Sequence, residues 1–151
     1  IALSTLDTGR ISLAAGAVGL MQRALDLSLA YAGERKQFGK PIAQFQLVQE
    51  HLAAMKLDLE AARLLTYRAA WKKVKGEPYT LEASLAKLFA SEAANRVAYR
   101  AIQVHGGYGF FEEYEVARLY RDARILTLYE GTSEVQKLII GAHLTGVRAF
   151  A

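Results

Sequence analysis

Hydrophobic positions recur along this chain at alternating spacings of four and three residues, which is the period of an amphipathic helix. Ala14, Val18, Met21 and Leu25 keep this spacing near the start of the chain. They predict a first helix over residues 8–32, whose apolar stripe packs against the rest of the domain.

Two further long helices are predicted. The second covers residues 44–74, and its apolar stripe consists of Val48, Leu52, Met55, Leu59 and Ala62. Pro78 and Thr80 mark a restart, so a third helix is predicted over residues 81–104. Its stripe consists of Leu85, Leu88, Ala93 and Val97.

Two shorter helical segments follow. A helix over residues 113–123 carries Arg118 and Asp122 as an i,i+4 ion pair. Ser133 and Gln136 have the spacing of a capping box, which predicts a final helix that starts there and ends near Gly141 or Phe150.

Glycine and proline gather at the junctions between these segments, and the isolated stretch 125–129 is too short to build a sheet. Long helices joined by short turns are typical of helical bundles. The sequence therefore predicts an all-α fold, an antiparallel up-and-down four-helix bundle with an extra short helix.

Several apolar residues of the second helix lie off its main stripe: Phe45, Leu47, Leu57, Leu64, Leu65 and Trp71. Packing in the domain's own core is one explanation. Contact with another domain or another subunit is the alternative, because one face of a bundle cannot cover every side of a helix.

Composition excludes several classes of protein. The 151 residues suffice for one domain with its own core, and without Cys there are no disulfides or thiolate metal sites. The three His are far apart, so no metal site is expected. The net charge of +4 comes without a nucleic-acid-binding motif, and no apolar run could span a bilayer. The chain begins at Ile1 without Met, which suggests an excerpt from a longer protein.

Residues 129–136 carry the clearest candidate chemistry. Glu130 and Gly131 directly precede the predicted last helix, so Glu130 is expected on a short connection with its side chain in a cleft. Gly131 would let a ligand approach the backbone closely. A Glu base needs desolvation, since raising its pKa from about 4.3 to about 7 takes about 4 kcal/mol. The alternative is an exposed loop carboxylate beside a turn glycine.

Two junctions are further candidates. Residues 103–109 form either a plain glycine helix terminator or a close backbone approach to a flat or phosphate-bearing ligand. Residues 35–41 form either a basic helix end with a turn, or a site where Arg35 binds a diphosphate and Phe38 packs on a ring. Asp7 and Arg10 have the spacing of a helix-start carboxylate and its i,i+3 partner.

Five blocks, in this order, resemble the C-terminal helical domain of the acyl-CoA dehydrogenases and cover nearly the whole chain. The blocks are residues 7–10, 34–39, 103–110, 120–124 and 129–134. The resemblance implies that residues 1–151 form such a domain, and that the family's N-terminal helical domain and middle β-domain lie outside this chain. It also implies a homo-oligomer, with a dimer of dimers (a homotetramer) as the expected assembly.

The resemblance further implies FAD as cofactor and an acyl-CoA as substrate. Glu130 matches the base that removes the α-proton of the thioester while a β-hydride passes to the flavin. Asp7, Arg10 and Gly131 match substrate-binding positions. The cofactor-binding matches are Arg35, Gln37, Phe38, Phe45, Gln46, Gln103, Gly106, Gly107, Thr132 and Glu134.

In the family, the residues at these positions contact the FAD molecules of two different subunits. The segments around Arg35 and Gln103 match residues that bind the FAD of a neighbouring subunit, whereas Thr132 and Glu134 match flavin contacts that follow the base. Phe45 stands where some members carry a His. In one branch of the family the base comes from the first helix near the position of Gly9, so a Glu at position 130 matches the short- or medium-chain arrangement better.

The expected function is α,β-dehydrogenation of an acyl-CoA in fatty acid β-oxidation, with electron-transferring flavoprotein as the partner that takes the electrons. The chain alone is expected to be inactive. Two alternatives stay open: a non-catalytic helical oligomerisation module, and an acyl-CoA oxidase. The expected location is the bacterial cytoplasm or the mitochondrial matrix, with no nucleic-acid or membrane partner.

Overall fold

The computed structural model describes the backbone of residues 2–149 and the side chains of residues 6–149. Its helices are α1 (Ala2–Glu34), α2 (Gln46–Val74), α3 (Thr80–His105), α4 (Glu115–Ile125) and α5 (Ser133–Thr145). A hairpin of β1 (Lys36–Gln37) and β2 (Lys40–Pro41) and the 3₁₀ turns η1 (Ile42–Gln44) and η2 (Gly106–Phe110) connect them. Within this described part, no helix combines the length and the hydrophobicity needed to cross a bilayer.

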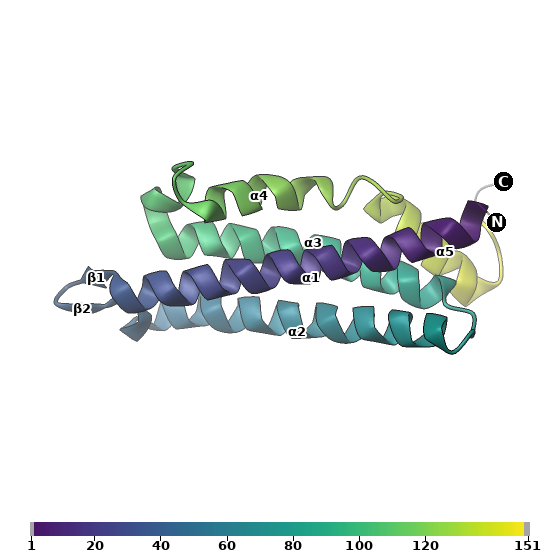
Figure 1. Cartoon of the computed structure of the whole chain (residues 1–151), viewed down its shortest axis with the longest axis horizontal. Coiled ribbons are helices and arrows are strands. Elements are labelled where there is room, and N and C mark those ends of the chain that lie inside the picture. The colour runs from purple at the N-terminus through teal and green to yellow at the C-terminus, as the bar shows by residue number, and fades with distance from the viewer. Residues whose placement is uncertain (1, 150–151) are drawn as a thin grey trace.

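Helices α1 to α4 run alternately up and down along one long axis (Figure 1). The three long helices pack against one another, α4 lies on α1 and α3, and α5 packs against α3. The predicted all-α bundle is therefore confirmed. The fourth position of the bundle is taken by the short helix α4, and the helix that stands outside the bundle is α5.

Helix α3 is the central element, since it contacts each of the other four helices. The face that it buries is made of small residues: Ala83, Ala86, Ala90, Ala93, Ala94, Ala98 and Ala101. Small side chains let neighbouring helices approach closely. The predicted stripe of this helix is correct for Ala93 and Val97, whereas Leu85 and Leu88 are only half-buried because partners surround α3 on several sides.

Apart from Val48, which is only half-buried near the start of α2, the stripes predicted for the first two long helices are confirmed. The buried members are Ala14, Met21, Leu25, Met55, Leu59 and Ala62, and the partly buried Val18 and Leu52 pack against them. Because α1 and α2 each turn this stripe toward α3, one contiguous core runs along the bundle axis.

Two predictions at helix ends are wrong. Helix α1 begins at Ala2, so Asp7 lies inside the helix rather than at its start. Arg118 forms its ion pair with Glu115, at 2.9 Å and i,i+3 spacing, instead of with Asp122. The Arg118–Glu115 pair places the Glu115 carboxylate in the first turn of α4, where the helix dipole favours a negative charge.

The capping box predicted for the last helix is also wrong in its residues. Thr132 is the N-cap, and its side chain accepts a hydrogen bond from the Val135 backbone N–H. Ser133 instead donates to Glu92, and the Gln136 side chain turns back to the preceding backbone. The helix ends at Thr145, between the two predicted ends, and Phe150 lies outside the described residues.

The connection between α1 and α2 is a β-hairpin rather than a plain turn. Lys36 pairs with Pro41, and Gln37 pairs with Lys40. At the tip, Phe38 has a φ of 51°, in the left-handed region that non-glycine residues seldom adopt. The Phe38 side chain is 91% exposed, so this hairpin presents an aromatic ring to its surroundings.

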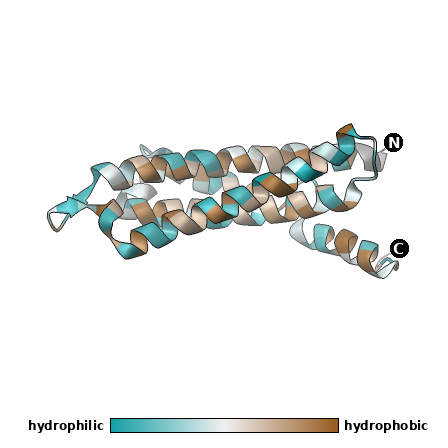
Figure 2. Cartoon of the chain, turned by 90° about the horizontal axis from the view of Figure 1, so that it is seen from below, coloured by the Kyte–Doolittle hydropathy of each residue, from teal (hydrophilic) through white to brown (hydrophobic). Residues whose placement is uncertain are grey.

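Much of the off-stripe apolar surface of α2 is exposed. Leu47, Leu57, Leu64 and Trp71 have exposed fractions of 78%, 72%, 68% and 56%, so packing in the domain's own core is the wrong explanation for them. Leu65, in contrast, packs against the core. Leu57, Leu64 and Trp71 are seven residues apart and so share one side of α2, the helix that faces the viewer in Figure 2.

Candidate active site

Glu130 lies on the connection between α4 and α5, with its carboxylate against the backbone of α1. A Cβ atom added at Gly9 would lie 2.5 Å from Glu130 Oε2 and 2.9 Å from Oε1, so the carboxylate occupies the space that a side chain at position 9 would need. Oε2 is buried and has no hydrogen-bond partner. The alternative of a solvated loop carboxylate is therefore wrong, and one carboxylate oxygen of Glu130 lies buried without a hydrogen-bond partner.

The backbone at this position is unusual. Glu130 has a φ of 59° and Gly131 a φ of 87°, so two successive residues are left-handed. A Cβ at Gly131 would lie 2.7 Å from the Gln136 amide nitrogen. Gly131 thus allows a close approach by the protein's own Gln136 side chain, whereas the predicted approach of a ligand to this glycine stays a prediction. A non-glycine residue in this conformation costs about 1 to 3 kcal/mol, which the surroundings of Glu130 must offset.

Three side chains from three helices bind the carbonyl oxygens of this turn. Gln136 Nε2 donates to the oxygens of Glu130 and Gly131, both at 3.1 Å. Lys87 Nζ donates to the Gly131 oxygen at 2.7 Å, and Arg10 Nε approaches the Glu130 oxygen at 3.4 Å. The sequence reasoning singled out neither Lys87 nor the side-chain role of Gln136.

Lys87 is fully buried, which is rare for a lysine. Burial lowers its pKa, and the charge of Arg10 lowers it further, while Glu92, Glu130 and Glu134 act in the opposite direction. One sequence signal could have identified Lys87. It falls at helical spacing among small residues of α3, the alanines and serines one turn before and one turn after it.

Asp7 and Arg10 form the predicted i,i+3 pair beside Glu130. Arg10 Nη1 donates to Asp7 Oδ1 at 2.7 Å, and Thr80 Oγ1 donates to Asp7 Oδ2 at 2.6 Å. Both Asp7 and Arg10 are 6% exposed. The pair joins α1 to the first turn of α3 and holds the Arg10 guanidinium toward the 130–131 turn, whereas its contact with a substrate stays a prediction.

Thr132 and Glu134 follow the turn at the start of α5. Glu134 is exposed, and hydrogen bonds from its own backbone N–H and from Thr132 lower the pKa of its carboxylate. A shallow pocket of about 320 Å³ opens beside them. Its lining consists of Glu92, Asn95, Arg124, Thr127, Leu128, Ser133 and Glu134.

A second pocket, of about 530 Å³, lies where α1 ends and α3 meets η2. It brings together five of the predicted cofactor-binding residues: Arg35, Gln37, Gln103, Gly106 and Gly107. His105 and Tyr31 stack at 4.3 Å between ring centroids and form part of its wall, and burial lowers the pKa of His105. The pocket therefore combines a cation, side-chain amides and aromatic rings.

The two glycines of this pocket form a cradle. A Cβ added at Gly106 or Gly107 would meet nothing within 4 Å, and Gly106 has a φ of 62°. Arg35 lies over the Tyr108 ring, with its guanidinium carbon 5.4 Å from the ring centroid. A guanidinium beside an open glycine backbone suits a phosphate-bearing ligand with a flat ring system, so these residues fit a dinucleotide cofactor.

Three other predicted cofactor residues lie outside this lining. Phe38 and Phe45 meet edge to face, with their ring centroids 6.2 Å apart, and Lys40 lies over the Phe45 ring. Gln46 is exposed at the first turn of α2. The three residues belong to the hairpin end of the bundle, next to the pocket in sequence but on its outer side.

The sequence matches the family described as "Acyl-CoA dehydrogenase, C-terminal domain" over residues 1–145. This chain belongs to that family.

Named relatives agree with this membership. The chain is 55% identical to "Probable acyl-CoA dehydrogenase YngJ" of Bacillus subtilis over 94% of its own length and 37% of the relative. It is 51% identical to the bovine mitochondrial short-chain specific acyl-CoA dehydrogenase over 95% of the chain and 35% of the relative. The solved butyryl-CoA dehydrogenase of Megasphaera elsdenii superposes with a TM-score of 0.93 at 50% identity, covering 95% of this chain and 37% of that one. The chain thus spans little more than a third of these relatives.

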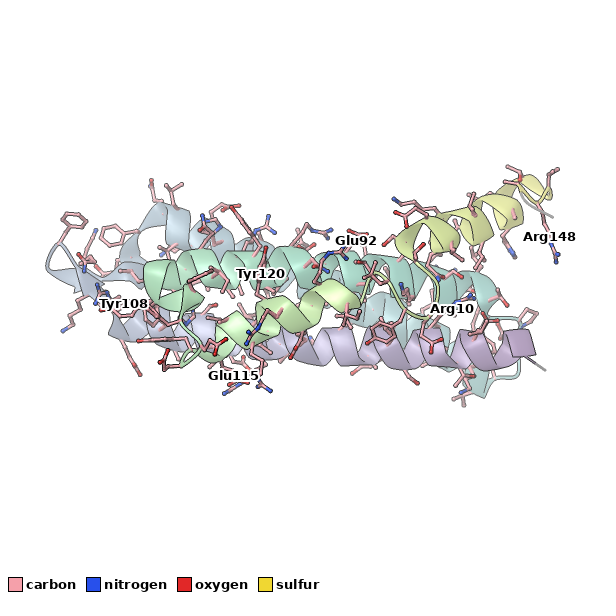
Figure 3. All side chains as sticks on the ribbon, turned by 90° about the horizontal axis from the view of Figure 1, so that it is seen from above. Arg10, Glu92, Tyr108, Glu115, Tyr120 and Arg148 are labelled. Carbon is pink, nitrogen blue, oxygen red and sulfur yellow. The ribbon has the colours of Figure 1, made fainter. Side chains whose placement is uncertain are left out.

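In this acyl-CoA dehydrogenase domain the candidate residues form two groups at opposite ends of the bundle. Arg10, beside Glu130, lies near one end, and Tyr108, beside Arg35, lies near the other (Figure 3). Gly9 and Arg35 are 26 residues apart along α1, or about 39 Å at 1.5 Å per residue. Within the described residues, no group of three or more acidic or His side chains could hold a metal ion.

Proposed function

We propose that this domain supplies the catalytic base of an FAD-dependent acyl-CoA dehydrogenase, and that Glu130 removes the α-proton of an acyl-CoA thioester. One observation carries the proposal: Glu130 Oε2 is buried and unpaired against the backbone of α1. A structural carboxylate at such a place would pair with a nearby cation, whereas a base must keep an oxygen free for the proton.

The proposed reaction balances within the substrate and the bound cofactor. The α C–H bond breaks, its proton goes to Glu130, and its electron pair forms the new double bond as the β-hydrogen leaves as hydride. FAD, when bound, supplies the two-electron acceptor for that hydride. A substrate that covers Glu130 also excludes water, which strengthens the carboxylate as a base.

The two ends of the bundle are proposed to serve two different FAD molecules. Arg35, Gln37 and Gln103 would bind the diphosphate and adenosine half of a cofactor held mainly by a second subunit. Thr132 and Glu134 would approach the cofactor beside Glu130. The separation of about 39 Å along α1 supports this division, because one FAD could not reach both ends.

A short or medium acyl group is the proposed substrate class, and electron-transferring flavoprotein the proposed electron acceptor. Gly9 supports the proposed acyl group, since a glycine at this position leaves the space that the Glu130 carboxylate occupies. Names of two relatives, short-chain specific acyl-CoA dehydrogenase and butyryl-CoA dehydrogenase, also support it.

Anaerobic titration of the full-length protein with butyryl-CoA tests the proposal. We expect a yellow protein whose flavin absorbance bleaches within the mixing time and returns when a dye acceptor or electron-transferring flavoprotein is added. Because the chain spans little more than a third of its relatives, we expect the isolated domain to show no turnover. A colourless full-length protein would contradict the proposal and favour a non-catalytic helical module. Fast reoxidation by oxygen alone would identify an oxidase.

A homo-oligomer, with a dimer of dimers as its arrangement, is proposed to bury the exposed side of α2. Leu57, Leu64 and Trp71 present an apolar heptad-spaced stripe there. We expect Leu64→Lys in the full-length protein to shift size-exclusion elution to a smaller species. Leu144→Lys, at a 75% exposed leucine near the end of α5, is the matched control and should elute as the wild type. Unchanged elution of Leu64→Lys would place the subunit contact elsewhere.

A further inference from the structure

The side chains that donate hydrogen bonds to the 130–131 turn share one property: they bind its backbone oxygens. Lys87, Gln136 and Arg10 come from α3, α5 and α1, and their hydrogen bonds reach the carbonyls of Glu130 and Gly131. Meanwhile Glu130 Oε2 is left without any partner. The turn is thus fixed from three sides while one carboxylate oxygen stays unbound.

This division has a chemical consequence. A hydrogen bond from a cation to an ionised carboxylate stabilises the charged form and weakens the group as a base. A hydrogen bond to the neighbouring carbonyl restrains the same residue and leaves the carboxylate oxygen free to accept a proton. The donors can therefore hold Glu130 in its left-handed conformation and over Gly9 without occupying Oε2.

A buried ammonium is an expensive way to satisfy one carbonyl oxygen. Lys87 is fully buried at the position of α3 that meets this turn, and its neighbours on that helix are small alanines and serines, none of them charged. In most cores an apolar side chain of similar volume is at least as stabilising as a buried charge. A role in stability alone therefore does not explain a lysine there.

We propose that Lys87 is a positioning residue for the base, acting with Gln136 to hold the 130–131 turn so that the Glu130 carboxylate lies over Gly9. This inference rests on the proposed function of Glu130. Lys87 itself touches no reacting atom, since its contact is the Gly131 carbonyl oxygen at 2.7 Å.

Lys87→Met in the full-length protein tests the inference, because Met keeps the volume and removes the donor. We expect α-proton exchange and flavin reduction, each measured per bound flavin, to fall about 10- to 100-fold, as expected for a shift of the base on the order of 1 Å. The KM for acyl-CoA and the flavin content should stay within about twofold of wild type. A crystal structure of the variant should place the Glu130 carboxylate away from Gly9.

Lys137→Met is the matched control, since it removes an exposed lysine one residue from Gln136 on α5. We expect it to leave the rate per bound flavin unchanged. If Lys87→Met does not fold, Gln136→Met replaces it with the same expected result. Wild-type rates per flavin in the folded variant, with the carboxylate still over Gly9, would overturn the inference. Glu130→Gln run in parallel separates the two hypotheses, because exchange retained in that variant would overturn the proposed base itself.

Discussion

Glu130→Gln in the full-length protein should abolish measurable α-proton exchange while the flavin stays bound. The amide keeps the size of the side chain and its place against Gly9, but it cannot accept the proton. A positioned base contributes roughly 10² to 10⁴ in rate, so flavin reduction by substrate should fall by at least that factor. Deuterium incorporation into a bound acyl-CoA, followed by mass spectrometry, measures the exchange, and absorbance near the flavin bands measures cofactor content.

Glu113→Gln is the matched control for this variant. Glu113 also lies on a connection, just before α4, but it is exposed, so its replacement should leave the exchange rate unchanged. Exchange at the wild-type rate in Glu130→Gln would remove Glu130 from the role of base. The remaining carboxylates near the turn, Glu92 and Glu134, would then be the next residues to replace.

Gly9→Ala should give a stable protein with little activity. The added methyl group would lie 2.5 to 2.9 Å from three atoms of the Glu130 carboxyl group, so the carboxylate has to move. Because it is the free end of a flexible side chain, it can move without unfolding the domain. A displacement of about 1 Å is enough to lower a rate by roughly 10²-fold. Stopped-flow flavin reduction and thermal unfolding, measured on the same sample, test both halves of the prediction.

Gly16→Ala provides the comparison on the same helix. A Cβ at Gly16 meets nothing within 4 Å, so this variant gains helix propensity, worth up to about 1 kcal/mol, without disturbing the base. We expect the melting temperature of Gly16→Ala to rise and its rate to match wild type. A Gly9→Ala protein that reduces flavin at the wild-type rate would mean that the carboxylate does not need its place on α1.

The long helices follow from the sequence because their signal is repeated over many turns. The stripes of α1 and α2 identify the buried faces correctly, and Pro78 with Thr80 marks the start of α3 to within one residue. The buried face of α3 is harder to predict from the sequence, because a helix surrounded on several sides has no single apolar stripe. Its alanines carry little hydrophobic signal individually, and close packing rather than amphipathicity decides which positions are buried.

Local contacts at the site are less predictable for a different reason. Ser133 and Gln136 fit a capping box, but Thr132 is the cap, because Glu92 of α3 and the 130–131 turn compete for those two side chains. The contact of Lys87 is also hard to predict, because the Gly131 carbonyl that it binds lies 44 residues further along the chain. The local sequence makes Glu130 a candidate, since Gly131 and the helix start directly follow it, and its role as base stays a prediction. The partners that hold it come from segments far away along the chain.

The exposed, left-handed Phe38 at the hairpin tip affects the stability and the handling of the domain. A left-handed aromatic residue that is 91% exposed lowers the stability of the bundle that carries it, and a glycine there would relieve the backbone. A second subunit with its cofactor at the hairpin end, as proposed above for Arg35 and Gln37, would cover this ring and offset the cost. Produced without that neighbour, the domain would expose the Phe38 ring to other copies of itself, so we expect its aggregation to increase with protein concentration.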